Sequence, residues 1–255
     1  MNRREFLFQI GITLNGSYSV NKDSVIKRVK IKSKKLQGLS VLAIADIHIS
    51  RFFQPSWDQF NFNLGQDLSV LLGDYFYIMD FERSNMEFVN SLIRNFDLFL
   101  QSLSGIVPVM AVLGNHDRKH YRIPFKEILS KYGVSLLVNE GLSFRGIEIF
   151  GSDDFLTGFP QLPPYADLVI THNPDYFCYL LSQASFKSFT VAGHTHGGQI
   201  TVFGKPILLN IGCTKYVSGY FKEEWGELYV SNGLGVVGIP LRFNAPSEIT
   251  LLEFV

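Results

Sequence analysis

Short polar motifs follow apolar runs at five places along this chain, and four of these motifs hold five of its six histidines. The motifs are Asp46-Ile47-His48, Gly73-Asp74, Gly114-Asn115-His116-Asp117, His172-Asn173-Pro174 and Gly193-His194-Thr195-His196. Apolar runs of this length are typical of buried strands, and the C-terminal ends of parallel strands meet at one edge of a sheet. The pattern therefore predicts an α/β fold that gathers these side chains in one place.

The runs that precede the motifs predict strands at residues 39–45, 68–72, 106–113, 168–171 and 189–192. Between residues 83 and 101, apolar side chains recur at steps of three and four, which predicts an amphipathic helix with one buried face. These side chains are Met86, Val89, Ile93, Phe96 and Leu100. After residue 200 we expect glycine-punctuated strands, including 227–230 and 248–253, that form a second sheet packed on the first.

The side chains in the motifs are ligands for a particular kind of metal. Imidazole, carboxylate and amide oxygen together suit a divalent transition metal better than calcium, which takes oxygen alone, or structural zinc, which usually takes thiolates. In Asp46-Ile47-His48 and His194-Thr195-His196 we expect alternate side chains to project to the same side of an extended segment. Two motifs have an ordinary alternative: Gly73-Asp74 fits a turn, and His172 fits a histidine that satisfies a loop backbone.

The five motifs, in this order, resemble those of the calcineurin-like metallophosphoesterases, over a core spanning residues 39–200. The resemblance implies a four-layer α-β-β-α sandwich of two mixed sheets flanked by helices. It also implies two divalent metal ions, manganese, iron or zinc, and hydrolysis of a phosphoester, phosphodiester or pyrophosphate bond. A non-catalytic scaffold with the same fold is the competing class. Loss of metal ligands would favour the scaffold, and none of the motif ligands is lost in this sequence.

The metal ligands that the resemblance implies are carboxylates, imidazoles and one amide, with Asp74 as a bridge between the two ions. The other ligands of the first ion are Asp46, His48 and His196, and those of the second ion are Asn115, His172 and His194. His116 is expected to protonate the leaving group, and Asp117 to orient the ring of His116 and raise its basicity. Arg118-Lys119-His120 follows directly and fits either contacts with substrate phosphate or a solvated polar turn.

Five further stretches narrow the resemblance to one bacterial branch of the family. They are residues 193–200, 216–219, 229–235, 240–243 and 246–249. That branch includes twin-arginine-exported phosphoesterases and a membrane-associated hydrolase of UDP-2,3-diacylglucosamine in lipid A biosynthesis, which implies a lipid-linked substrate. The alternative is a phosphodiesterase that acts on soluble nucleotides or cell-wall phosphodiesters. Residues 75–78 depart from the pattern, because relatives commonly carry a further acidic residue there, and they predict a more aromatic pocket beside the metals.

Aromatic side chains crowd the segment after His48. They are Phe52, Phe53, Trp57, Phe60 and Phe62. One interpretation is an apolar wall beside the metals that takes an acyl chain or makes peripheral contact with a membrane. The alternative is that these side chains fill the core, as such clusters usually do.

The N-terminal residues 1–21 are expected to stand apart from a single domain spanning residues 22–255. Residues 2–7 resemble a twin-arginine export signal and predict a membrane-associated or cell-envelope protein, with a frayed terminus on a cytoplasmic protein as the alternative. Residues 22–35 carry seven Lys or Arg, which suit either anionic lipid or an exposed strand edge. Because the formal net charge is zero, no overall field favours nucleic acid, and we expect none to bind. The substrate that the resemblance implies is a phosphorylated small molecule or lipid.

Overall fold

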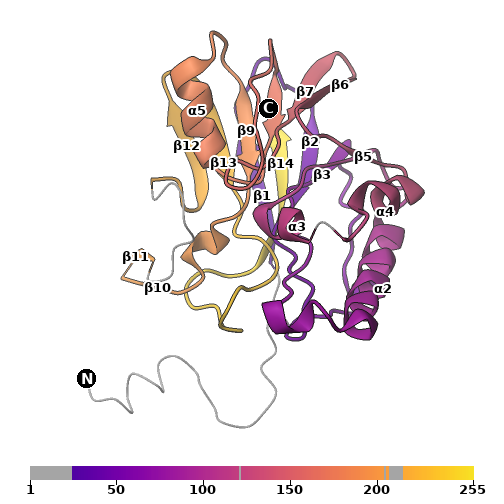
Figure 1. The fold of residues 1–255 in the computed structure, drawn as a ribbon. Helices are drawn as coiled ribbons and strands as arrows, with labels where there is room; N and C mark the ends of the chain where they lie inside the picture. The colour runs from indigo at the N-terminus through magenta and orange to yellow at the C-terminus, as the bar shows by residue number, and fades with distance from the viewer. Residues whose placement is uncertain (1–24, 121, 204, 207–214) are drawn as a thin grey trace.

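The computed structural model describes residues 25–120, 122–203, 205–206 and 215–255, which form two stacked six-stranded sheets with helices outside them (Figure 1). The first sheet has the order β1 (Val25–Ile31), β14 (Glu248–Phe254), β2 (Ser40–Ile44), β3 (Leu68–Leu71), β4 (Val109–Ala111) and β5 (Val134–Leu136). The second has the order β12 (Gly219–Glu223), β13 (Gly226–Val230), β9 (Phe189–Ala192), β8 (Leu168–Ile170), β7 (Ile147–Gly151) and β6 (Glu140–Phe144). The short strands β10 (Thr201–Val202) and β11 (Lys205–Pro206) pair with each other.

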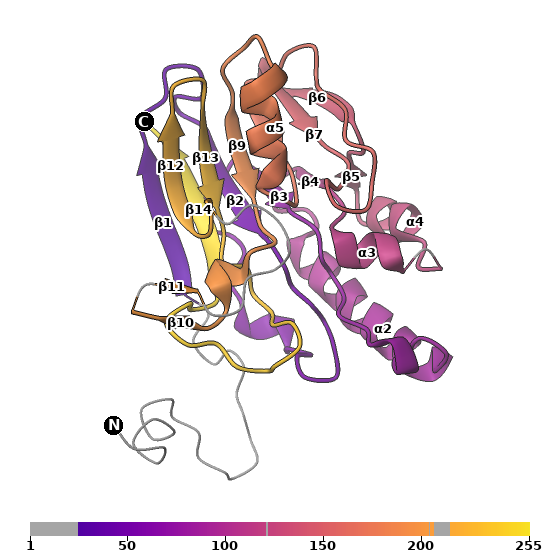
Figure 2. The ribbon, with the colours of Figure 1, turned by 60° about the vertical axis from the view of Figure 1, so that its left-hand side comes forward.

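Helices cover the outer face of each sheet, which gives four layers. Helices α2 (Met86–Leu103) and α4 (Phe125–Lys131) pack on the first sheet, and α5 (Asp175–Gln183) packs on the second (Figure 2). Shorter helical turns lie in the loops, and they are α3 (Asn115–Lys119), η1 (Trp57–Gln59), η2 (Asp80–Glu82) and η3 (His196–Gly198). Each sheet contains both parallel and antiparallel pairs, so the predicted sandwich of two mixed sheets is confirmed.

The central strands β2, β3 and β4 of the first sheet are buried on both faces because their side chains alternate between two cores. In β2, Leu42 and Ile44 pack in the core beneath α2, whereas Val41 and Ala43 pack in the core between the two sheets. The strands predicted before four of the motifs are β2, β3, β8 and β9, and the strand predicted at residues 106–113 is shortened to β4. The carboxyl end of each strand therefore delivers one motif.

Helix α2 begins at an Asn85 cap, whose side chain accepts a hydrogen bond from the Phe88 backbone N–H at 3.0 Å. Val89, Phe96 and Leu100 are buried as predicted. Met86 is 51% exposed, so its expected place on the buried face is wrong. It is the first residue of the helix and lies one turn ahead of the buried stripe. The helix also buries side chains outside the expected list, and they are Leu92, Phe99 and Leu103.

The expectation that both late strands join the second sheet is wrong for β14. This strand lies in the first sheet, where it pairs in parallel with β1 and antiparallel with β2. Its side chains are almost all buried, as the position between two other strands requires. Strand β1 is then the edge of the first sheet, which is the place that the exposed-edge interpretation of residues 22–35 gave to its lysines.

The aromatic segment after His48 belongs mainly to the core. Phe53, Trp57 and Phe62 are buried beneath α2, and the Trp57 indole donates hydrogen bonds to the Asn95 backbone carbonyl at 3.0 Å and to its side-chain oxygen at 2.9 Å. Phe60 packs against the same cluster, partly buried. The predicted acyl-binding wall is therefore wrong for these four side chains. Their apolar surface is already buried in the core, so it is not available to bind an acyl chain.

The predicted export signal at residues 1–21 lies outside the described residues. Within the part of the chain that the structure describes, no helix combines the length and the apolar character needed to cross a membrane.

Candidate metal centre

The backbone turns sharply at the residues that the motifs supply. Asp46, His48, Asp74, His194 and His196 all have positive φ angles, between 48° and 74°. Such left-handed conformations are uncommon for residues other than glycine and cluster at functional sites. The expectation of extended Asp-x-His and His-x-His segments is therefore wrong. The strands end before the ligand candidates, and left-handed turns bring the side chains together.

One cluster combines Asp46, His48 and His196, each at most 2% exposed, with ligand atoms that lie within 4.8 Å of one another. The Nε2 atoms of the two imidazoles are 3.1 Å apart. Asp46 Oδ1 lies 3.6 Å from the Nε2 atom of His196 and has no hydrogen-bond partner among the described residues. A buried carboxylate oxygen without a donor is costly, so this donor set fits a cation that would pair with that oxygen.

The second cluster combines Asp74, His172 and His194 within the same 4.8 Å limit. The Nδ1 atom of His172 lies 2.8 Å from the Leu72 carbonyl, so it carries the proton of the neutral ring and donates it to that oxygen. The His172 Nε2 atom is thereby left for a metal. It lies 3.1 Å from the Nδ1 atom of His194 and 3.2 Å from the Oδ1 atom of Asn115. The loop-backbone alternative for His172 is correct for one ring nitrogen, while the other faces the cluster.

Asp74 joins the two clusters. Its Oδ2 atom lies 3.4 Å from the His48 Nε2 atom and 3.3 Å from the His172 Nε2 atom. Its Oδ1 atom accepts a hydrogen bond from the His116 backbone N–H at 2.8 Å. One carboxylate oxygen therefore faces ligand atoms of both clusters while the other is fixed by the backbone.

The loops that carry Asp74 and Asn115 are in direct contact. A Cβ atom at Gly114 would overlap the Asp74 carboxylate, and one at Gly73 would overlap the backbone at Gly114, so neither position has room for a side chain. The Asp117 carboxylate ties the same loops together. It accepts backbone N–H bonds from Asp74 at 2.6 Å, from Tyr75 at 2.9 Å and from Gly114 at 2.9 Å.

This geometry gives Asp117 a different part from the one expected. Its carboxylate accepts three hydrogen bonds from backbone N–H groups, and among the described residues it has no hydrogen bond to the His116 ring. The physical reason is that the Asp117 carboxylate points back to the start of α3, where backbone N–H groups lack partners within the helix. Asp117 therefore positions the loop that carries Asp74, and through it the bridge.

His116 lies beside the first cluster and beside an aromatic side chain. Its ring centroid is 5.1 Å from that of His48 and 5.4 Å from that of Tyr77, and both pairs meet nearly edge to face. Tyr75 and Phe76 are buried in the core. Residues 75–78 are the segment that departs from the family pattern. Of its aromatic residues, Tyr77 is the one that contacts the histidines of the site.

Burial and neighbouring charges shift the pKa values of the site in opposite directions. Burial raises the pKa of Asp46 to about 7 and lowers the pKa of His48 to about 3. Burial also opposes protonation of His172, but the carboxylates of Asp74 and Asp46 outweigh it and hold the pKa of His172 well above its usual range. In the metal-free protein the His172 ring therefore carries a second proton, on Nε2, that a metal would have to displace.

Arg242, within the stretch 240–243 that narrows the family resemblance, contacts the first cluster. Its guanidinium donates hydrogen bonds to the carbonyl oxygens of His196 at 3.0 Å and Asn232 at 2.8 Å, and its Nη2 atom lies 3.2 Å from the His196 Nδ1 atom. Burial and then the charges of His48 and Arg242 keep the pKa of His196 well below its usual range. His196 is thus neutral, as a metal ligand must be.

The segment after Asp117 separates into two environments. Arg118 forms an ion pair with Asp153 at 2.8 Å, so its charge is already partnered. His120 is 6% exposed, and the alternative of a solvated polar turn is wrong for this residue. Lys119 is exposed and makes no ion pair with any described residue.

Two mixed sheets with paired clusters of carboxylate and imidazole at their strand ends define a metal-dependent hydrolase. The chain belongs to the calcineurin-like phosphoesterases, whose family model matches residues 39–198. It is 32% identical to phosphodiesterase YaeI of Escherichia coli over 238 residues, which cover 84% of this chain and 82% of that protein. It is 28% identical to an uncharacterized metallophosphoesterase of Helicobacter pylori over 268 residues, which cover 98% of this chain and 69% of that protein.

Proposed function

We propose that this protein is a two-metal hydrolase of phosphodiester bonds. The observation that carries the proposal is the position of the Asp74 Oδ2 atom, which lies 3.4 Å from an imidazole nitrogen of one cluster and 3.3 Å from one of the other. Two neighbouring cations need one carboxylate oxygen placed between their ligand sets in this way. The name of the Escherichia coli relative supports a phosphodiester as the bond that is cleaved.

The donor atoms favour two transition-metal ions. The proposed ligands of the first ion are Asp46, His48 and His196, those of the second ion are Asn115, His172 and His194, and Asp74 contacts both. Nitrogen-rich sets with one amide and two carboxylates suit manganese, iron or zinc. When bound, two such ions supply positive charge to an anionic phosphate and lower the pKa of a water molecule. Asn115 offers a neutral amide oxygen, so it adds a ligand without further negative charge.

His116, held beside Tyr77, is the side chain that would transfer a proton to the leaving group. In hydrolysis a water oxygen forms a bond to phosphorus, the bond from phosphorus to the leaving oxygen breaks, and the leaving oxygen takes a proton. We assign that proton to His116. Burial lowers the pKa of His116, so its protonated form is a stronger acid than free imidazole and gives up its proton more readily. Tyr77, edge-on to the ring, restricts the orientations of His116.

A metal-reconstitution assay tests the proposal. Protein treated with chelator should be inactive, and manganese, iron or zinc should restore hydrolysis with two ions per chain by elemental analysis. Full activity in chelator would contradict the proposal. The substrates should be bis-p-nitrophenyl phosphate, a nucleotide and UDP-2,3-diacylglucosamine. Turnover of the last alone would support a lipid-linked substrate, whereas turnover of the first two alone would support a soluble one.

We also propose, from the sequence alone, that the protein works at the cell envelope. The support is the twin-arginine pattern at residues 2–7. Replacing both Arg3 and Arg4 by Lys should move the protein from the envelope fraction to the cytoplasmic fraction. An unchanged distribution of the two proteins would reject the export signal.

A further inference from the structure

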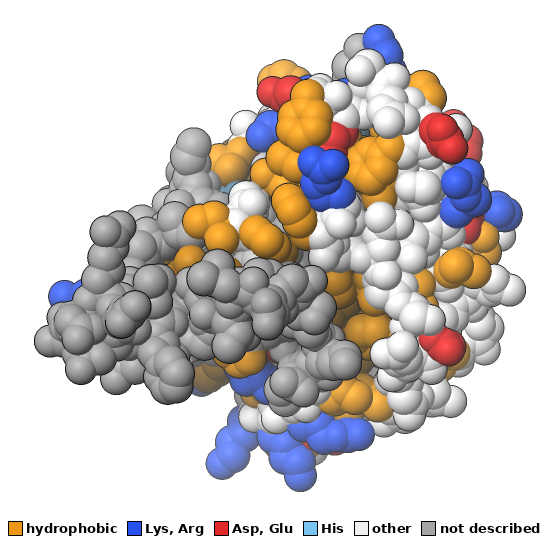
Figure 3. All heavy atoms as spheres, turned by 90° about the horizontal axis from the view of Figure 1, so that it is seen from below, with side chains coloured by type: hydrophobic (Ala, Val, Ile, Leu, Met, Phe, Trp, Pro, Cys, Tyr) orange, Lys and Arg blue, Asp and Glu red, His pale blue; other side chains and the backbone are white. Residues whose placement is uncertain are grey.

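A groove of about 590 Å³ lies between the N-terminal half of α2 and the segment that joins α3 to α4. Its lining is largely apolar, and the apolar side chains include Ile78, Met86, Val89, Ile93, Ile123 and Pro124. A volume of this size holds a drug-sized molecule or a medium-length alkyl chain. Figure 3 views the molecule from below, where hydrophobic side chains stand beside Lys and Arg on the surface.

The groove begins where the metal centre ends. His116 and His120 are four residues apart on and just after α3, so they lie on the same side, one turn from each other. His120 lines the groove. On the opposite wall, Tyr77 contacts the His116 ring, and the next residue, Ile78, lines the groove. Burial and then the charges of Lys119 and Arg83, which line the groove, lower the pKa of His116. The groove therefore lies near the side of the centre on which His116 stands.

Two polar features separate this groove from a simple packing defect. The Nε2 atom of His120 is buried and has no hydrogen-bond partner among the described residues. Burial and then the charge of Arg83 lower the pKa of His120 to about 4, so the ring is neutral near pH 7 and can serve one polar atom of a ligand. Lys119 and Arg83 line the same groove. Arg83 is paired there with Asp80 at 2.8 Å, whereas Lys119 makes no ion pair with any described residue and brings positive charge to the groove.

We propose that this groove binds the leaving group of the substrate, and that the leaving group is an alcohol with an apolar chain or ring. This inference rests on the proposed phosphodiesterase function, because it takes His116 as the group that protonates the leaving oxygen. An alcohol released beside His116 has the groove directly behind it. Lys119 suits the anionic phosphodiester from which it leaves, and the apolar lining suits its chain.

A series of methyl 4-alkylphenyl phosphates, with alkyl chains of one to eight carbons, tests the inference. Water cleaves the aryl ester, giving a 4-alkylphenol and methyl phosphate, and the chain barely changes the acidity of the phenol. For metal-loaded protein, kcat/KM should rise about fourfold with each added methylene until the groove is filled, which corresponds to ~0.8 kcal/mol per buried CH₂. Activity without any dependence on chain length would overturn the groove assignment.

Matched variants on α2 locate the effect. Met86→Gln replaces an apolar lining residue and Met86→Trp fills the groove, so both should flatten the dependence of kcat/KM on chain length. Leu98→Gln changes a residue of the same helix that is 56% exposed and outside the groove, and it should keep the full dependence. Thermal unfolding checks that each variant is folded. Equal dependence in Met86→Gln and in Leu98→Gln would also overturn the assignment.

A binding measurement separates this inference from the proposed function. The chain has four methionines, so the ¹³C-labelled methyl signal of Met86 can be assigned by its loss in Met86→Gln. In the metal-free protein, 4-octylphenol should shift that signal and phenol should not. If no phosphodiester is cleaved by the metal-loaded protein, the proposed function fails while this shift still supports the groove. An unmoved Met86 signal rejects the groove whatever the activity.

Discussion

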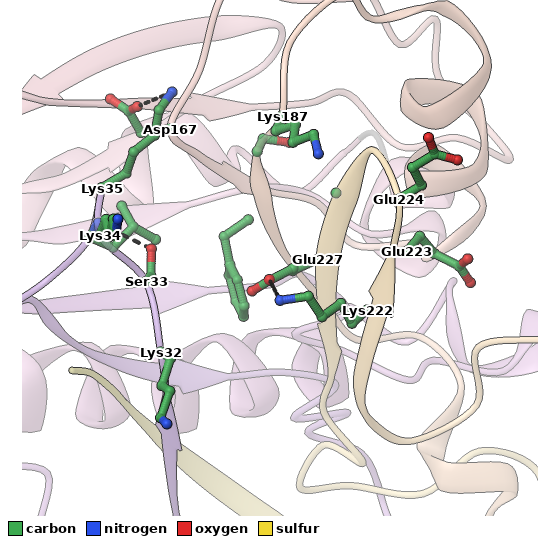
Figure 4. A pocket seen from close by; sticks show the side chains of 14 residues that line it. Lys32, Ser33, Lys34, Lys35, Asp167, Lys187, Lys222, Glu223, Glu224 and Glu227 are labelled. Carbon is green, nitrogen blue, oxygen red and sulfur yellow. Dashed lines mark hydrogen bonds and ion pairs between the residues drawn. The ribbon is translucent and has the colours of Figure 1, made fainter.

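The two ends of the β-strands hold charged side chains under opposite conditions. At the end away from the metal centre, a pocket of about 340 Å³ is lined by lysines and acidic residues, and Figure 4 shows two pairs of opposite charge among them. Lys35 lies 3.2 Å from Asp167, and Lys222 lies 2.8 Å from Glu227. At the metal-centre end, the carboxylates of Asp46 and Asp74 face imidazoles and are buried. In the first pocket these opposite charges partner each other at the surface, whereas the buried carboxylates at the metal-centre end would be partnered by cations.

The same residue type shows the difference in its pKa. Burial raises the pKa of Asp46 to about 7. Burial also opposes ionisation of Asp167, but hydrogen bonds from the Tyr165 hydroxyl, the Glu148 backbone N–H and Lys35 outweigh it and hold its pKa below its usual value. The number of charged side chains in a pocket therefore does not by itself identify a functional site. What marks a site is buried charge that the protein itself leaves without partners.

Replacing the bridge should produce the largest effect, and an aspartate at the other end provides the matched control. Asp74→Asn should abolish hydrolysis of bis-p-nitrophenyl phosphate and remove most bound metal, because both proposed ions lose a shared anionic ligand. The loss should exceed the about 10- to 100-fold that removal of a hydrogen-bond partner behind a metal ligand costs. Asp167→Asn should leave activity and metal content unchanged. Equal losses in the two variants would remove the distinction between the two ends.

Proton transfer can be separated from metal binding within the centre. His116→Ala should retain two metal ions per chain but lower kcat by about 10²- to 10⁴-fold, the usual contribution of a general acid. Metal content and kcat should be measured on the same preparation. Metal loss as large as in Asp74→Asn would reassign His116 from proton transfer to support of the metal centre.

The raised pKa of Asp46 predicts a pH-dependent gain from metal. In the metal-free protein, its contribution to stability is present below its unfolded value of 3.8 and is lost as pH rises through about 7. A cation favours the ionised carboxylate, so the increase in Tm that manganese gives should grow between pH 6 and pH 8. Differential scanning with and without chelator measures it. In Asp46→Asn this growth with pH should shrink, and an unchanged pH dependence in that variant would count against Asp46 as its source.

The smallest effect is expected at the paired end. Lys222→Ala removes an exposed ion pair with Glu227, and such pairs contribute about 0–1 kcal/mol. Urea unfolding should therefore give a free energy close to that of the unchanged protein, and the effect should shrink further at high salt. A loss of several kcal/mol would show that this end depends on its ion pairs more than their exposure suggests.

Local pattern in the sequence was enough to predict the strands that carry the motifs. Strand β9 coincides with the predicted residues 189–192, and the ligand candidates of both clusters follow strands as expected. The placement of β14 was missed because pairing between strands depends on residues more than 200 positions apart, such as Val25 and Glu248. Local hydrophobic pattern carries no information about such partners.

The contacts of Asp117 and Arg242 could not be predicted from the sequence for a similar reason. Asp117 stands within a recognised motif, yet the direction of its carboxylate depends on how the Gly73-Asp74 loop crosses the Gly114 loop. Arg242 lies in an irregular loop, and its contact with His196 joins positions 46 residues apart. The roles of the ligands and the boundary of the domain at residue 22 stay predictions.

The proposed metal ligands come from both sheets of the sandwich. Asp46, Asp74 and Asn115 follow strands of the first sheet, whereas His172, His194 and His196 follow strands of the second. Two bound ions would thus cross-link the two sheets at one edge of the sandwich. Sliding of one sheet past the other would be resisted there, and pulling the layers apart would require breaking coordinate bonds as well as exposing the apolar core. Backbone amides of β8 and β9 would then exchange with solvent more slowly in the metal-loaded protein, far from any direct contact with a substrate.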